Sequence, residues 1–290
     1  MNSRNLFFRT ILVISFLMIF SVSAFAIEIG GGANIYSTNN YFWRVAGIEN
    51  PHAQYDFGLS TSASGVDISV SPWVSYDLDL KEVDEVDYVV DLGYAIGDIS
   101  LNAGAIYYDV TGIPETTEIY GSVGYSLGIA EVLNLSPGIT FYYDIQEVKA
   151  GYLEPSLSID TPKFEYVSAS ATLGYDLGQF VIGDEAEAES KLTTLQLGIS
   201  GSYEIMKGVS VSPSFTYALG LTDGIDSASF VGLGFGFEFC RASVLWQKSG
   251  CLSGKHLKNI CKQLDKFRRF CLHIQYRILF FNRFIFFKKL

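Results

Sequence analysis

The sequence predicts an all-β fold, namely a single antiparallel transmembrane β-barrel of about twelve strands. Three observations predict it. Apolar and polar side chains alternate about a dozen times between residues 27 and 239, the expected lipid-facing positions hold no Asp, Glu, Lys or Arg, and the chain begins with an export signal. We therefore divide the 290 residues into a signal peptide (1–26), an outer-membrane barrel (27–239) and a basic, cysteine-containing tail (240–290).

Residues 1–26 have the features of a secretory signal peptide. Arg4 and Arg9 precede an apolar stretch at residues 11–20, and the small residues of Ser-Ala-Phe-Ala at 23–26 follow it. We expect cleavage after Ala26. The alternative, a single transmembrane anchor, is disfavoured because the apolar stretch is shorter than the roughly 20 residues that a spanning helix needs.

The expected strands follow from the period of two, at which successive side chains point to opposite faces. Val86, Tyr88 and Val90 share one face, for example, and Asp87 and Asp91 share the other. A lipid-facing Lys or Arg at the bilayer midplane costs roughly 2 to 4 kcal/mol, so a membrane selects an uncharged outer face. The expected strands are residues 27–35, 53–59, 66–78, 86–96, 99–107, 119–127, 135–145, 153–159, 167–177, 195–205, 209–219 and 231–239.

Short and long links alternate between these strands, as periplasmic turns and extracellular loops do in outer-membrane barrels. The short links are 64–65, 97–98, 161–163 and 206–208, and the long ones are 37–52, 79–85, 109–117, 178–191 and 220–228. Two links depart from this pattern. The link at 128–133 is longer than expected for a turn at its end of the barrel, and the link at 145–150 is shorter than expected for a loop at the other end. The alternation predicts one barrel with its loops at one end.

Prolines and aromatic residues add two local expectations. A proline within a strand removes a ladder donor, so we expect β-bulges at Pro72, Pro137, Pro155 and Pro213. Aromatic residues crowd the strand ends, which is typical of the girdles at membrane interfaces, although they favour any strand. These aromatic residues are Tyr36, Tyr41, Phe42, Trp43, Tyr107, Tyr108, Tyr142 and Tyr143.

The segment Asn40-Tyr41-Phe42-Trp43-Arg44-Val45-Ala46-Gly47-Ile48 resembles the first hairpin of the TorF-type porin family of Gram-negative outer membranes, which carries an aromatic-Arg-Gly-Ile turn. Further similar segments are Trp73-Val74-Ser75, Asp87 to Tyr94, Gly104 to Tyr108 and Glu118-Ile119-Tyr120, so the resemblance covers about residues 27–239. Here Val45-Ala46 are inserted between the Arg and the Gly-Ile, which puts the geometry of that turn in question. The resemblance implies a small outer-membrane porin whose substrate the family does not define.

The end of the barrel is expected at Phe239, because a final strand ending in Phe is similar to the signal that barrel-assembly machinery recognises. Beyond it the composition changes, since residues 240–290 hold 12 of the 20 Lys and Arg residues, only one acid and all four cysteines. The cysteines lie about ten residues apart, unlike the ligands of a zinc site or a known redox motif. Two interpretations remain for this disordered or helical tail: a basic amphipathic segment on an anionic membrane surface, and a frameshift or readthrough product, which we favour.

The barrel segment is strongly acidic. It has 30 acidic and 6 basic residues, a net charge near −24, and the basic tail brings the whole chain to −11. Carboxylates on the inward phase predict a lumen that attracts cations, with the lysines in the links. Equally, many of these acids lie at strand ends, where solvent outside the pore would surround them. The candidate pore-lining residues are Asp67, Asp77, Asp87, Asp91, Glu118, Asp144, Glu154, Asp176 and Glu204, together with Arg44, which we expect to reach inward from loop 37–52 and pair with acids.

These observations favour a porin for passive diffusion of small hydrophilic solutes, with a preference for cations. The alternative is a closed or plugged barrel with a structural or surface-interaction role, because a twelve-stranded barrel is narrow and loop 37–52 is long enough to plug it. We expect no enzyme, because the barrel has one histidine, His52, in a loop.

We expect no metal and no other cofactor. The acidic stretch 184–189 has the ligand chemistry to hold Ca²⁺ loosely, but a solvated loop is the better interpretation. The expected partners are outer-membrane lipid and lipopolysaccharide, the barrel-assembly machinery and small ions or solutes. Nucleic acid is not expected, because the barrel segment has no basic patch.

Overall fold

A computed structural model describes residues 27–39, 41–48, 50–130, 133–161, 167–180 and 189–244. The expected signal peptide at residues 1–26 lies outside the described residues, as does the tail from residue 245 onwards. The predictions for both segments therefore stay predictions.

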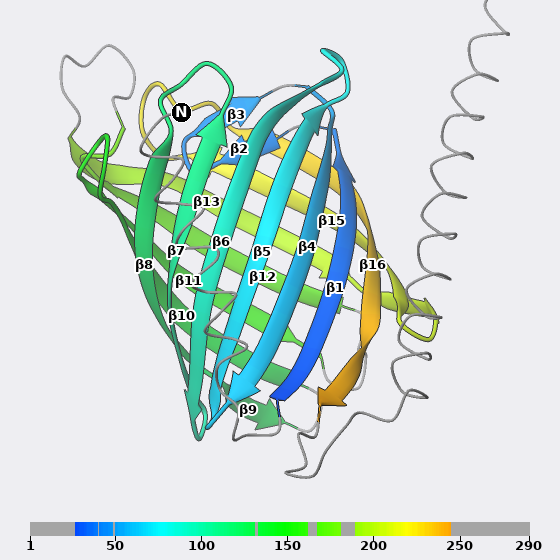
Figure 1. The fold of residues 1–290 in the computed structure, drawn as a ribbon. Coiled ribbons are helices and arrows are strands. Elements are labelled where there is room, and N and C mark those ends of the chain that lie inside the picture. Colours follow the sequence, from blue (N-terminus) through cyan, green and yellow to red (C-terminus); the bar gives the residue numbers. More distant parts are fainter. Residues whose placement is uncertain are drawn as a thin grey trace, which may run out of the picture. The chain divides into compact units, whose positions relative to one another are not determined.

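The described chain forms a closed antiparallel barrel of twelve strands, which confirms the predicted fold class (Figure 1). Each strand pairs with its neighbour in sequence, and β1 closes the barrel by pairing with β16. The strands of the wall are β1 (Ile27–Thr38), β4 (His52–Ala63), β5 (Val66–Asp77), β6 (Glu82–Ile96), β7 (Ile99–Val110), β8 (Thr116–Tyr125) continued by β9 (Leu127–Ala130), β10 (Leu133–Asp144), β11 (Gly151–Asp160), β12 (Val167–Leu177), β13 (Ser190–Gly201) continued by β14 (Tyr203–Met206), β15 (Val209–Gly220) and β16 (Ala228–Val244).

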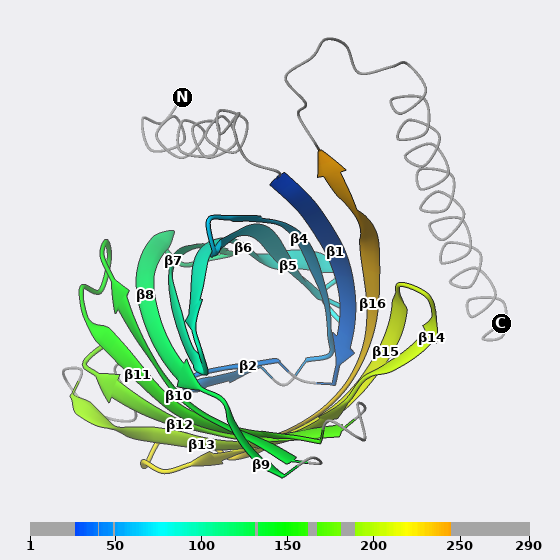
Figure 2. The same cartoon turned by 90° about the horizontal axis from the view of Figure 1, so that it is seen from below.

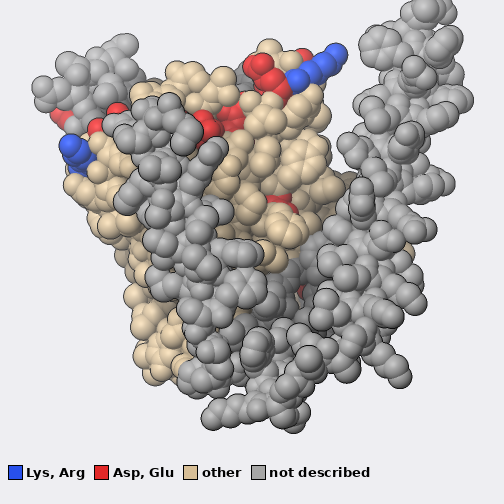
Figure 3. Space-filling model, in the orientation of Figure 1, with Lys and Arg blue, Asp and Glu red and all other residues tan. Residues whose placement is uncertain are grey.

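The two faces of this wall differ as the alternation predicts. Large apolar side chains such as Leu59, Ile199 and Phe215 are exposed on the outer face, whereas carboxylates, hydroxyls and glycines occupy the inner face. Figure 3 shows charged side chains gathered at one end of the barrel, while the visible wall below them is almost entirely uncharged. No helix in the described part of the chain has the length and apolar character needed to span a lipid bilayer.

The prolines interrupt the ladder without shifting its register, so the prediction of bulges at these positions was wrong. Pairing on either side of Pro137 keeps one register, with Gly138 opposite Gly124 and Leu135 opposite Leu127. Pro137 therefore faces the junction between β8 and β9, and by the same argument Pro213 faces the junction between β13 and β14. A missing N–H removes a local pair, but the neighbouring pairs are enough to hold the register.

The last strand is longer than the sequence predicted. It continues past Phe239 to Val244, and its end pairs with the start of β1, with Val244 opposite Ile27. A register shift between Ile29 and Gly31 separates this pairing from the rest of the seam. The extension has a simple cause, because β1 begins at Ile27 and offers its first residues as ladder partners.

One hairpin lies apart from the wall. Its strands, β2 (Tyr41–Trp43) and β3 (Ala46–Ile48), pair only with each other and belong to the long link between β1 and β4. Viewed along the barrel, β2 crosses the inside of the ring (Figure 2). This hairpin lies at the end of the barrel that carries the other long links, which we call the loop end, and the opposite end is the turn end (Figure 1).

Candidate functional site

The tip of the β2–β3 hairpin is a two-residue turn formed by Arg44 and Val45, because Trp43 pairs with Ala46. Arg44 has a φ of 51°, in the left-handed region that costs a residue with a side chain about 1 to 2 kcal/mol. Arg44 therefore lies at the tip of the hairpin.

The Arg44 side chain forms a buried ion pair with Glu118 of β8. Its Nη1 donates to Glu118 Oε1 at 2.6 Å and its Nη2 donates to Oε2 at 2.8 Å, which is the bidentate geometry that matches a guanidinium to a carboxylate. Arg44 is 4% exposed and Glu118 is 1% exposed. The inward reach and acid pairing that the sequence led us to expect of Arg44 are therefore present in the structure.

Two further side chains complete the polar contacts of this pair. Gln179, in the link after β12, accepts from Arg44 Nη1 at 2.9 Å, and the Tyr108 hydroxyl of β7 donates to Glu118 Oε2 at 2.9 Å. Burial alone would lower the pKa of Arg44, but the hydrogen bond and charge of Glu118 raise it above its ordinary value. The guanidinium therefore stays charged throughout the physiological range.

Aromatic rings surround the same guanidinium. Its Cζ atom lies 4.5 Å from the ring centroid of Trp43, 4.4 Å from that of Tyr142 and 4.8 Å from that of Tyr152. All three distances are within the range of a cation–π interaction. We call the set of side chains around Arg44 the guanidinium cage, and its members are Trp43, Tyr108, Glu118, Tyr142, Tyr152 and Gln179.

The hairpin reaches this cage by crossing the lumen. It leaves the wall between β1 and β4, whereas Tyr142 and Tyr152 belong to β10 and β11, which lie on the opposite side of the twelve-stranded ring. The backbone is held as well, because Thr194 Oγ1 of β13 donates to the Arg44 carbonyl at 3.3 Å. The hairpin therefore narrows the lumen near the loop end.

Four of the predicted pore-lining acids hydrogen-bond to the backbone of the turn or loop that follows their strand. Asp77, Asp144 and Asp176 end β5, β10 and β12 and are buried. Each accepts backbone N–H groups from the link that follows: residues 79 and 80 for Asp77, 146 to 148 for Asp144, and 179 and 180 for Asp176. Exposed Glu204 does the same at the turn end, accepting from Gly208 at 2.8 Å. These carboxylates terminate strands, and their charge is already compensated by N–H dipoles.

The remaining predicted acids face the lumen along its length. Asp87 is 8% exposed, and its Oδ1 has no hydrogen-bond partner among the described residues. Asp91 accepts from the Tyr120 hydroxyl at 2.5 Å, and Glu154 lies near the cage, bonded to Tyr142. Asp67 is exposed at the turn end, where Ser62 donates to it.

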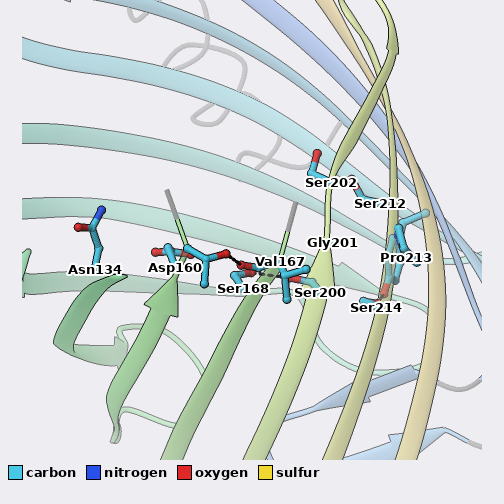
Figure 4. Close-up of a pocket in the computed structure, with 12 residues that line it drawn as sticks. Asn134, Asp160, Val167, Ser168, Ser200, Gly201, Ser202, Ser212, Pro213 and Ser214 are labelled. Carbon is cyan, nitrogen blue, oxygen red and sulfur yellow. Dashed lines mark hydrogen bonds between the residues drawn. The ribbon is translucent and has the colours of Figure 1, made fainter. Parts of the chain in front are cut away.

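Below the cage, toward the turn end, hydroxyl groups line the lumen. A cavity of about 480 Å³ is bordered by serines of β12, β13 and β15 and by Ser202 between β13 and β14, with Asn134 and Asp160 at its edge (Figure 4). Ser168 and Ser200, which are paired on the neighbouring strands β12 and β13, hydrogen-bond to each other at 2.8 Å, and the Tyr36 and Ser214 hydroxyls contact each other. Uncharged hydroxyls that both donate and accept make this part of the lumen suitable for water and hydrophilic solutes.

The barrel is similar in fold to solved outer-membrane proteins. An outer membrane channel from Pseudomonas putida F1 matches with a TM-score of 0.50 and 8% identity, over 74% of this chain and 96% of that one. The NanC porin matches with a TM-score of 0.46 and 12% identity, over 72% and 99% of the two chains. The translocator domain of the autotransporter NalP from Neisseria meningitidis matches with a TM-score of 0.39 and 9% identity, over 82% of this chain and 96% of that one.

At such low identities the likeness shows the fold alone. No family model matches the chain, and no curated protein matches it in sequence. The resemblance to TorF-type porins therefore stays a prediction. The fold itself is that of outer-membrane β-barrels.

Sequence reasoning missed the aromatic half of the cage. It assigned Trp43, Tyr108 and Tyr142 to girdles at the membrane interface, whereas these side chains contact Arg44 or Glu118 inside the barrel. Of the expected girdle residues, Tyr107 and Tyr143 lie on the outer face with neighbouring rings. The alternation of side chains along the strands could have placed these residues correctly, because Tyr108 and Tyr142 lie on the same inward face as Asp87 and Asp144.

Two charged residues of the inner face were also misplaced or overlooked. Lys191 was expected in a link, but it lies in β13 opposite Asp176. Glu85 shares the face of Asp87 two residues along β6 and is 7% exposed. The described residues contain no group of His, Cys, Asp or Glu side chains arranged to hold a metal ion, and most of the acidic stretch 184–189 lies outside them.

Proposed function

We propose that this protein is a passive outer-membrane channel for small hydrophilic solutes, narrowed by the β2–β3 hairpin and selective for cations. One observation carries the proposal: a closed barrel encloses a polar lumen, hydroxyl-lined below and carboxylate-lined above. The apolar outer wall would contact lipid and lipopolysaccharide.

The charge of the lumen supports cation preference. Arg44 compensates Glu118, and backbone N–H groups compensate Asp77, Asp144 and Asp176. Asp91 also faces the lumen, where it accepts a hydrogen bond from the uncharged Tyr120 hydroxyl, and the barrel segment as a whole has 30 acidic and 6 basic residues. Fixed carboxylates in a narrow pore raise the local concentration of cations and lower that of anions.

The test is conductance of the refolded full chain in a planar bilayer with a salt gradient across it. We expect discrete current steps and a reversal potential that favours the cation. A reversal potential that favours the anion would contradict cation preference.

A second candidate is a barrel that the hairpin keeps closed, with a structural or surface role. The crossing of the lumen by the hairpin and the burial of its tip favour this candidate. The same conductance measurement distinguishes the two candidates. If the native chain and variants that release the hairpin all fold but pass no current, the closed barrel replaces the channel as the better proposal.

A further inference from the structure

Arg44 sits in the barrel as a ligand sits in a binding site. It enters from a hairpin that pairs with no wall strand, and its terminal group makes its contacts with side chains from distant parts of the chain. Except for Trp43, every member of the guanidinium cage lies outside the hairpin. The wall strands and the link after β12 therefore supply the carboxylate, the amide and three tyrosine rings, and none of these groups belongs to the hairpin that carries the guanidinium.

The chemistry of this site selects one kind of cation. Two carboxylate oxygens of Glu118 match two parallel N–H groups at 2.6 and 2.8 Å, and Gln179 accepts a further hydrogen bond at 2.9 Å. The rings of Tyr142 and Tyr152 face a flat, weakly hydrated cation. A hydrated metal ion lacks both the planar shape and the paired donors, and a neutral planar molecule lacks the charge.

A second carboxyl group, that of Glu154, lies close to the site. Glu154 is close enough to act electrostatically on Arg44, although Glu118 already pairs with it. Asp91, bonded to Tyr120, lies on the same inner face. Carboxyl groups other than Glu118 are thus present on the inner face to attract a solute cation.

We propose that the guanidinium cage is a binding site for solutes that carry a guanidinium group, and that Arg44 occupies it in their absence. Such a solute competes with Arg44 for Glu118 and the tyrosine rings, and its binding frees the hairpin tip. The proposal rests on the proposed channel function, because it names the class of solute that the channel would admit.

The test removes the internal occupant and adds guanidinium itself. Arg44→Gly suits the turn, because Arg44 has positive φ and glycine adopts that conformation without strain. The matched control is Lys149→Gly, which removes an exposed basic residue with a φ of 56° from another loop. Circular dichroism of both refolded full-length variants establishes that they fold.

The first readout is binding, followed by tyrosine and tryptophan fluorescence as guanidinium chloride is added at non-denaturing concentrations. We expect Arg44→Gly to bind guanidinium about tenfold more tightly than Lys149→Gly does, because its cage is vacant. Urea, which is planar but neutral, and sodium chloride should give no such signal. Adding Glu118→Gln to Arg44→Gly should abolish most of the gain. Equal responses of the two glycine variants would overturn the proposal.

The second readout is conductance, which separates the site from the channel. We expect Arg44→Gly to conduct more than the native chain, and guanidinium but not urea to return its current toward the native level. If Arg44→Gly binds guanidinium but passes no current, the proposed binding site is supported and the proposed channel function is contradicted. If Arg44→Gly conducts but guanidinium changes neither its current nor its fluorescence, the proposed binding site is contradicted and the channel function is not.

Discussion

At the scale of single residues, the Arg44–Glu118 ion pair is the contact that fixes the tip of the β2–β3 hairpin. Arg44 has the positive φ of a turn residue, and its buried side chain is paired with the carboxylate of Glu118. Removing one partner of such a pair leaves the other charge buried without compensation, which costs more than the pair itself is worth. The hairpin position is therefore sensitive to a change that keeps the shape of residue 118 and removes only its charge.

We expect Glu118→Gln to release the hairpin tip, because it weakens docking by about 2 to 4 kcal/mol. Trypsin cleaves after Arg44 only where that residue is accessible, so the variant should be cut there while the native chain is not. Cleavage at exposed Lys149 serves as the internal reference. The exposed loop variant Glu147→Gln should behave as the native chain does, and equal protection of Arg44 in all three proteins would contradict this role of Glu118.

The rings of the cage contribute separately from the carboxylate. Tyr142→Leu removes a ring 4.4 Å from the guanidinium and should weaken docking by about 1 kcal/mol, whereas Tyr142→Phe keeps the ring and should weaken it less. The same trypsin assay ranks the two variants by their rate of cleavage at Arg44. An equal rate for leucine and phenylalanine would show that the ring face carries no part of the docking.

At the scale of strands and loops, aspartates end three strands in one way. Asp144 accepts the N–H groups of residues 146 to 148 and the Thr116 hydroxyl, so it organises the link between β10 and β11. Asp144→Ala should lower the free energy of unfolding by about 1 to 3 kcal/mol, measured by urea titration in detergent. Asp144→Asn keeps acceptor geometry and should lose less, and Glu147→Ala is the control in the same loop. A loss no larger in Asp144→Ala than in the control would contradict this role.

Pro213 provides a second test of how the strands are held together. Pro213 leaves a gap in the ladder between β15 and the β13–β14 strand, while the register on both sides is continuous. Pro213→Ala restores an N–H donor without altering the register, and it should raise the free energy of unfolding by about 1 kcal/mol. Slower amide exchange near Gly201 would show that the ladder has closed. Unchanged exchange there would mean that the gap has another cause.

Sequence reasoning captured these elements well, because strand position depends on local alternation. Every expected strand is present, and even the link at 128–133 is short once Leu127–Ala130 is recognised as strand β9. It captured the site less well. That Arg44 turns inward follows from its charge, but its pairing with Glu118 over the other acids depends on which strands lie opposite loop 37–52 in the closed ring. The alternation places Tyr142 and Tyr152 on the inward face, but the residue that they contact across the lumen leaves no trace in local spacing.

At the scale of the whole molecule, the barrel segment has 30 acidic and 6 basic residues, and some of its carboxylates face the lumen. Asp91→Asn should therefore shift the reversal potential in a salt gradient toward zero, because Asp91 faces the lumen and asparagine keeps an acceptor for the Tyr120 hydroxyl while it removes the charge. Asp223→Asn removes the same charge from an exposed loop and should shift it much less. Equal shifts for the two variants would assign selectivity to the overall charge of the protein instead of to the lumen.

The crossing hairpin also has a consequence for how the barrel assembles. Its residues are made early, between the first two wall strands, but its docking partners lie on β8, β10, β11 and β13. The tip can therefore dock only after those strands have joined the sheet, and the open loop end gives it a way into the lumen. Once docked, the hairpin connects the β1–β4 side of the wall to the β10–β11 side, so it opposes any change in the width of the ring at that level.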